Sequence, residues 1–145
     1  MKTFVYIDHF KGEVQPASWE AIGLAKNYGT AVAIIFGADT DEISKAAFEY
    51  GADEVIVVDD AALTDYRAEP YASTLSALAS ASTPDLILFP TTARTRELAA
   101  MSAVDLSTGV LTDVTGFEMN GDQVIATRPI YEGKVSEKTV CSGKP

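Results

Sequence analysis

Apolar and polar positions in the first two thirds of the chain follow two alternating periods. Short continuous apolar runs, typical of strands buried on both faces, are separated by segments whose apolar residues recur every three or four positions. The runs predict strands over residues 3–7, 31–36, 54–58 and 86–89. Buried strands joined by helices require a mainly parallel sheet with helices on both faces. We therefore predict a three-layer, Rossmann-like α/β domain with strand order 3-2-1-4-5.

Four helices are predicted between and after these strands. Pro16 and Pro70 favour the starts of the first and third, Asp39 with Glu42 resembles a capping box for the second, and the fourth runs from about Arg96 to Leu106. Glycines at 29 and 51 suit the ends of the first two helices, and the third is expected to end near residue 81. The residues expected to face the sheet are Trp19, Ile22 and Ala25; Ile43, Ala46, Ala47 and Tyr50; Leu75 and Leu78; and Leu98, Met101 and Val104.

The pattern changes after Gly109 to one of strands and turns. Residues 110–119 and 123–130 flank Asn120-Gly121, a strong signal for a β-hairpin, and residues 134–141 read as a further short strand. We therefore expect a β-hairpin or meander appended to the α/β core. The final Gly143-Lys144-Pro145 has the composition of a domain boundary.

The charge balance excludes two classes of partner. The chain has 145 residues and a formal net charge of -10, whereas binding to nucleic acid or to an anionic membrane surface requires clustered Lys and Arg. No apolar run approaches the length of a membrane span, so no membrane insertion is expected. The single cysteine, Cys141, cannot form an internal disulfide, and with one histidine it does not support a metal site. We expect a cytoplasmic protein.

Motifs for catalysis and for nucleotide binding are missing from the expected places. The loop after the first strand reads DHFKGEVQPAS and lacks G-x-G-x-x-G, and neither a phosphate-binding P-loop nor a G-x-S-x-G elbow occurs. His9 follows the first strand and could act as a general base, but no residue in the sequence is placed to orient it, which favours an ordinary loop histidine. No catalytic residues are therefore expected.

One stretch, PTTARTRE at residues 90–97, places two arginines where a buried strand gives way to a helix. Ligands of α/β sheets bind at this edge, and free N–H groups at a helix start attract anions. Thr91, Thr92, Arg94 and Arg96 are the candidate site residues. Three interpretations stay open: they bind a small anion, they contact protein through bidentate arginine pairs, or they are solvated.

Residues 85–140 also contain, in order, three family-like patterns. These are D-x-I-x-x-P at the end of the fourth strand, L-x-T-G-x-x-x-D-x-T in LSTGVLTDVT, and ATRPIYEGKV near the end. Upstream, GADEVIVVDD and EPYASTLSALA fit the same alignment. The chain resembles the N-terminal domain of the electron-transfer flavoprotein alpha subunit. It departs from that pattern at Tyr131-Glu132-Gly133, where paired glycines are commoner, and in having two arginines after Thr92 where one basic residue is usual.

The resemblance implies an adenine-nucleotide hydrolase-like fold and a role in electron transfer. Residues 1–145 would form the N-terminal scaffold and interaction domain, which pairs with a beta subunit as a heterodimer. FAD would be bound mainly by a second domain following Pro145, with no cofactor-binding residues in this chain. Electrons would pass from dehydrogenases to an acceptor through the whole complex. In this setting Arg94 and Arg96 would contact protein, from the beta subunit or the following domain.

An alternative interpretation is a standalone protein of the same fold that binds AMP or ATP. Its site would lie near Asp8, Gly37 and residues 91–96, at the carboxyl edge of the sheet. The missing glycine-rich loop argues against it.

Overall fold

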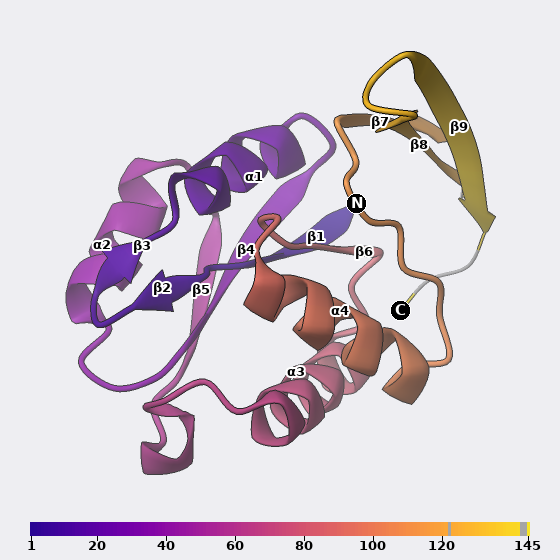
Figure 1. The fold of residues 1–145 in the computed structure, drawn as a ribbon. Helices are drawn as coiled ribbons and strands as arrows, with labels where there is room; N and C mark the ends of the chain where they lie inside the picture. Colours follow the sequence, from indigo (N-terminus) through magenta and orange to yellow (C-terminus); the bar gives the residue numbers. More distant parts are fainter. Residues whose placement is uncertain (122, 143–144) are drawn as a thin grey trace.

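A parallel sheet forms the centre of the computed structural model, which describes residues 1–121, 123–142 and 145. Its strands lie in the order β5-β4-β1-β6 (Figure 1). The strands are β1 (Lys2–Tyr6), β4 (Thr30–Phe36), β5 (Glu54–Val58) and β6 (Leu86–Leu88). This is the order 3-2-1-4 along the chain, so the predicted Rossmann-like parallel sheet is confirmed. Among the described residues, β5 and β6 are the two edge strands, and no strand beyond β6 takes the fifth place of the predicted order.

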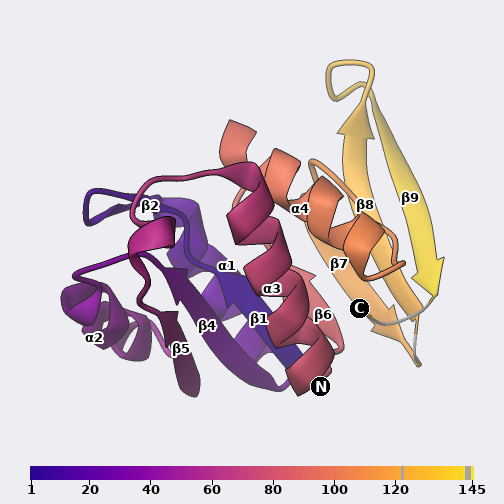
Figure 2. The ribbon, with the colours of Figure 1, turned by 90° about the horizontal axis from the view of Figure 1, so that it is seen from below.

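Two helices cover each face of the sheet and complete the three layers (Figure 2). Helices α1 (Pro16–Lys26) and α2 (Asp41–Glu49) lie on one face, and α3 (Ala68–Ser82) and α4 (Ala93–Asp105) on the other. A short 3-10 helix, η1 (Ala61–Leu63), precedes α3. Successive side chains of β1 point to opposite faces, so Phe4 packs with Leu75 and Leu98 while Val5 packs with Ile22. Both faces of the central strands are therefore core.

Helix α4 begins earlier than predicted, at Ala93 rather than near Arg96. Thr92 caps it by accepting a hydrogen bond from the Thr95 N–H, and the Thr95 hydroxyl accepts one from the Thr92 N–H. The prediction that Val104 faces inward is wrong, because this side chain is 78% exposed. At 3.6 residues per turn, Val104 lies about 240° around the helix from Leu98, which faces the sheet.

Two details of the α1 and α2 predictions are also wrong. Asp39 does not form a capping box, since the N-cap of α2 is Thr40 and no side chain caps it. Tyr50 is exposed, but its ring stacks on Trp19 with centroids 4.7 Å apart.

Gly29 lies beyond the C-cap of α1, Asn27, and a Cβ there would stand 2.2 Å from the Met1 carbonyl oxygen. The glycine is therefore required by the close approach of two backbone segments, and not by the end of helix α1.

The loop predicted after the first strand contains a small hairpin. It consists of β2 (His9–Phe10) and β3 (Glu13–Val14), paired antiparallel. Lys11 and Gly12 both have positive φ, 49° and 85°, as a tight type I′ turn requires. This hairpin lies directly after β1 and so borders the carboxyl edge of the sheet.

The C-terminal third forms a separate antiparallel sheet of order β7-β8-β9, which confirms the predicted meander. Its strands are β7 (Gly116–Asn120), β8 (Gln123–Ile130) and β9 (Val135–Ser142). The predicted strand over 110–119 is extended sheet only from Gly116, because Asp113 adopts a φ of 56° that interrupts it. Asn120 pairs with Gln123, so Gly121 lies in the predicted turn, while residue 122 lies outside the described residues, as do 143 and 144 of the predicted boundary.

The small sheet contacts the α/β core through an aromatic pair. The Tyr28 hydroxyl donates to the Phe117 carbonyl oxygen at 2.8 Å, and the two rings stack with centroids 4.7 Å apart. The two sheets are thereby held beside each other at the β6 edge (Figure 2). Within the described part of the chain, no helix has both the length and the apolar character needed to cross a bilayer.

Candidate functional site

The candidate site lies at the carboxyl ends of β1 and β6. These strands are neighbours, yet β1 leads to α1 on one face of the sheet while β6 leads to α4 on the other. Their connections diverge, which is the arrangement that opens a ligand crevice in α/β sheets. Asp8 follows β1 and the stretch 91–96 follows β6, so the fold brings the two sequence segments together.

Asp8 occupies the centre of this crevice and is 2% exposed. One carboxylate oxygen, Oδ1, pairs with Arg94 Nη2 at 2.9 Å. The other, Oδ2, accepts a hydrogen bond from the Thr92 hydroxyl at 2.9 Å. The Asp8 N–H donates to the Ser18 hydroxyl at the start of α1. Both carboxylate oxygens are therefore engaged by the turn that begins α4.

Arg94 is held from several sides. Its side chain is 30% exposed, and the guanidinium carbon lies 5.9 Å from the ring centroid of Phe10 on the small hairpin. The Arg94 carbonyl oxygen accepts from the Tyr66 hydroxyl at 3.1 Å, and the same hydroxyl lies 2.9 Å from Glu97 Oε2. The arginine is thus fixed against Asp8 rather than directed outward.

His9 is tied to the backbone of the neighbouring strand. Its Nε2 lies 2.7 Å from the Phe36 carbonyl oxygen, and since a carbonyl only accepts, Nε2 carries the proton in this contact. Nδ1 is buried and has no hydrogen-bond partner among the described residues. Gly37 lies against the ring, because a Cβ there would stand 3.4 Å from His9 Cε1. No carboxylate of residues 1–121 or 123–142 hydrogen-bonds to the imidazole, which favours the loop-histidine interpretation.

The crevice does not fit a phosphate group. The start of α4 would attract an anion, but Asp8 already supplies one, and the Thr95 N–H is used by the Thr92 cap. A phosphate placed there would meet a buried carboxylate of the same sign. The residues present therefore fit neither the phosphates of AMP or ATP nor the pyrophosphate of FAD.

The structure divides the four predicted site residues into two groups. Thr92 and Arg94 meet at Asp8, whereas Thr91 is exposed and Arg96 lies further along α4. Arg96 pairs with Asp113 in the segment before β7, and their side chains are 54% and 46% exposed. This pair connects α4 to the small sheet.

Sequence reasoning missed the partners of both arginines and the role of Thr95. The spacing Thr92-x-x-Thr95 resembles a capping box with Thr in the last position and could have indicated the helix start. The predicted topology placed Asp8 near residues 91–96, as part of the alternative nucleotide site, but nothing local indicated that Asp8, 84 residues from Thr92, would bind it. Asp113 is the aspartate of the L-x-T-G-x-x-x-D-x-T pattern, but that pattern did not indicate that it pairs with Arg96.

Three tyrosines beside the crevice have raised pKa values. Burial is the largest cause for Tyr6, Tyr66 and Tyr71, and for Tyr66 the hydrogen bond to Glu97 adds to it. Each hydroxyl is therefore held in its neutral form well above its ordinary pKa near 10.

A loss of stability in alkali follows from these shifts. A group whose pKa is raised on folding contributes stability that is present below its unfolded pKa and lost as the pH rises through the folded value. We expect the free energy of unfolding to fall between about pH 10 and pH 12, as tyrosines ionise in the unfolded chain. Urea unfolding across that range measures it. Tyr6→Phe should reduce the slope, and an unchanged slope would contradict the prediction.

Comparisons with known proteins agree with the family suggested by the sequence. The model of the electron transfer flavoprotein domain matches residues 3–145. Protein FixB of Azorhizobium caulinodans is 35% identical over 141 residues, which cover 91% of this chain and 38% of that protein. The electron transfer flavoprotein subunit alpha of Bacillus subtilis is 30% identical over 132 residues, 89% of this chain and 41% of that protein. That of Syntrophomonas wolfei is 29% identical over 144 residues, 99% of this chain and 45% of that protein.

The chain spans less than half the length of these relatives. The match nevertheless runs through both the α/β core and the small sheet, without interruption at the junction between them. On this evidence the chain belongs to the electron transfer flavoprotein domain family.

Proposed function

We propose that this chain is the N-terminal scaffold and interaction domain of an alpha-type subunit of an electron transfer flavoprotein. In this proposal residues 1–145 form one domain, and FAD is held mainly by protein outside them. The observation that carries the proposal is the family match across residues 3–145, together with relatives whose names specify the alpha subunit. Electrons would pass from dehydrogenases to an acceptor through the complete complex, in the cytoplasm.

The geometry of the crevice supports a scaffold rather than a ligand-binding role. The place where an α/β sheet usually binds its ligand is filled by the chain's own Asp8, Thr92 and Arg94. These groups stabilise the junction of β1, β6 and α4. The domain would therefore position the other parts of the complex and provide a surface that binds them, and it would contribute no catalytic residue.

We infer a surface for the beta subunit from what remains exposed. Thr91 and Arg96 lie outside the closed crevice, and the guanidinium of Arg96 retains room for a second, bidentate partner. Thr92 and Arg94 would not contact the beta subunit themselves but would hold the turn before α4 in place through Asp8. The small sheet adds exposed apolar side chains at Tyr131, Val135 and Val140.

Purification of the chain with and without a beta subunit tests the proposal. We expect the 145-residue chain alone to elute from gel filtration without flavin absorbance, and a tagged electron transfer flavoprotein beta subunit to retain it. Stoichiometric flavin on the isolated chain would overturn the scaffold assignment. Absence of any complex with several such beta subunits would overturn the partner assignment.

The Arg96→Gln variant should weaken that complex. We expect affinity for the beta subunit to fall about tenfold, or about 1.4 kcal/mol, because a rim arginine loses its carboxylate partner. The free energy of unfolding should change by less than about 1 kcal/mol, as the pair with Asp113 is half exposed. Titration calorimetry measures the affinity. Lys45→Gln, which removes an exposed pair with Glu42 on α2, is the matched control and should leave affinity unchanged.

A further inference from the structure

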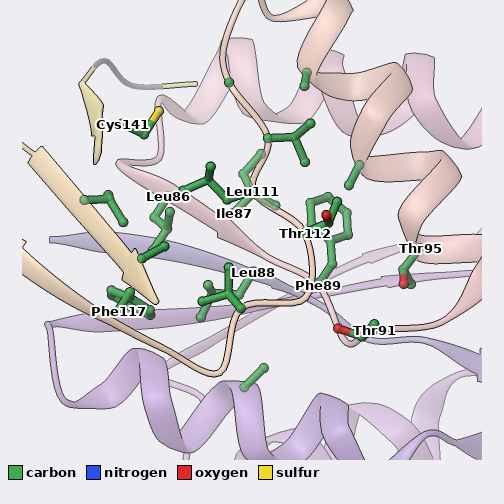
Figure 3. A pocket seen from close by; sticks show the side chains of 18 of the residues that line it. Leu86, Ile87, Leu88, Phe89, Thr91, Thr95, Leu111, Thr112, Phe117 and Cys141 are labelled. Carbon is green, nitrogen blue, oxygen red and sulfur yellow. The ribbon is translucent and has the colours of Figure 1, made fainter. Parts of the chain in front are cut away.

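The two edges of the central sheet differ in what borders them. Beside β6, the segment over residues 108–117 supplies Leu111 and Phe117 to the lining of a groove of about 470 Å³ (Figure 3). Within the described part of the chain, no strand lies beyond β5, which ends the sheet on the side away from β7, β8 and β9 (Figure 2). All five side chains of β5 are exposed or only partly buried, whereas six of the seven in β4 are buried. The outer edge of β5 is therefore the less covered of the two.

The backbone of β5 directs the hydrogen-bonding groups of two residues away from the sheet. The Gly37 N–H donates to the Val58 carbonyl oxygen at 3.1 Å, so Val58 faces β4. Successive residues of a strand direct their N–H and C=O groups to opposite sides, hence Ile56 also faces β4 while Val55 and Val57 face outward. The N–H and C=O groups of these two valines form a template for another strand.

Exposed apolar side chains flank this edge on the face covered by α1 and α2. Val57 is 40% exposed, and Phe48 of α2 is 53% exposed. Phe48 lies about 200° around α2 from Tyr50, which stacks on Trp19 of α1. Because α1 lies over β1 and β4 while α2 lies over β4 and β5, Phe48 points away from α1 and toward the open side of β5.

The opposite face has a shallow hollow at the same edge. It is lined by Val58 of β5 and by Leu78, with the small side chains of Ser73, Thr74 and Ala77 on α3. The side chains of an added strand would alternate between the two faces of the sheet. One set would cover the apolar groups on the α2 side, and the other set would enter the hollow on α3.

The charge around this edge selects the partner. Residues 39–65, which include α2 and β5, contain nine acidic residues and one basic residue and so carry most of the net charge of -10. Glu54 begins β5 and Asp59 follows it; both are exposed, and neither forms an ion pair among the described residues. A second copy of this chain would bring the same acids against them, and like charges across an interface oppose association. The surface therefore disfavours self-pairing and fits a basic partner.

We propose that the open edge of β5 is a docking site for an extended, basic segment of another protein. The segment adds a strand beside β5, pairing its backbone with Val55 and Val57, and places apolar side chains over Phe48 and into the hollow on α3. Its Lys or Arg residues at either end meet Glu54 and Asp59. This edge and the small sheet lie at opposite ends of the central sheet, so binding here leaves the small sheet free (Figure 2). The inference does not depend on the proposed electron-transfer role.

Amide hydrogen exchange of the 145-residue chain with a designed peptide tests the proposal. The probe is KKVTVTVTKK, in which alternating valines and threonines are flanked by pairs of lysines. At about 1 mM peptide we expect exchange at Val55 and Val57 to slow at least about tenfold, which corresponds to a Kd of about 0.1 mM. Ile56 is the internal control, because β4 already protects its amide. The peptide EEVTVTVTEE is the matched control probe and should give no protection.

Two variants of Val57 distinguish strand addition from other modes of binding. Val57→Pro removes an outward N–H without removing a hydrogen bond to β4, and proline is tolerated at such edge positions. Val57→Lys keeps the backbone but sets a positive charge against the basic peptide. We expect the protection of Val55 by the peptide to be lost in both variants, with Ile56 still protected. If Ile56 shows that the proline variant has not folded, the lysine variant decides.

Four results would overturn the proposal. The first is unchanged exchange at Val55 and Val57 with the lysine peptide. The second is equal protection by the glutamate peptide, which would remove charge as the basis of selection. The third is protection that appears without peptide and rises with protein concentration, which would assign the edge to a second copy. The fourth is peptide protection of Val55 that persists in folded Val57→Lys.

Discussion

Replacing Arg94 by methionine is expected to lower the free energy of unfolding by about 3 kcal/mol at neutral pH. The substitution keeps an unbranched side chain beside Phe10 but removes the only cation paired with Asp8 among the described residues. The Asp8 side chain is 3% exposed and would keep only the Thr92 hydroxyl as a side-chain donor among the described residues. Breaking a buried ion pair from one side is costly because the remaining charge has lost its compensation. Urea denaturation at neutral pH measures the loss.

The double variant Asp8→Asn with Arg94→Met provides the control. An asparagine carbonyl still accepts from Thr92 but carries no charge, so we expect the double variant to recover at least half of the stability lost in Arg94→Met. Arg96→Met, which opens the exposed pair with Asp113, should cost less than about 1 kcal/mol. A double variant less stable than Arg94→Met would show that the ion pair is not the source of the effect.

The Leu98→Ala substitution should destabilise the protein by a comparable amount, about 3 kcal/mol. Leu98 is fully buried between α4 and the sheet, and truncating it loses apolar burial and leaves a cavity. Val104→Ala on the same helix should change stability by no more than about 0.5 kcal/mol, because its side chain is 78% exposed. Chemical denaturation of both variants measures the difference. Equal losses would contradict the orientation of α4.

These two sites have different consequences for function. Leu98 fixes α4 on the sheet, whereas Asp8 and Arg94 fix the turn from which α4 begins. Together they place Thr91 and Arg96 on the outside of the molecule. A domain whose crevice is filled by its own ion pair is suited to binding another protein through its outer surface, which is the role proposed here.

The sequence correctly predicted most of the fold. Strands buried on both faces produce continuous apolar runs, and these located β1, β4, β5 and β6 within one or two residues. Turn and strand composition likewise predicted β8 over its whole length, residues 123–130. The errors fall where local preference competes with packing. Val104 matched an apolar spacing but lies outward, and Asp39 matched a capping pattern but precedes the actual cap.

The sequence by itself determined the α/β class, the appended meander and the position of two arginines at the carboxyl edge of the sheet. These follow from periodicity and turn chemistry, which act between residues close together in the chain. Only the tertiary structure decided what the arginines do. Arg94 pairs with Asp8 and Arg96 with Asp113 because folding brings distant segments together, and no local pattern encodes which charges will meet. The open edge of β5 is decided in the same way, since a strand's neighbours depend on the whole sheet.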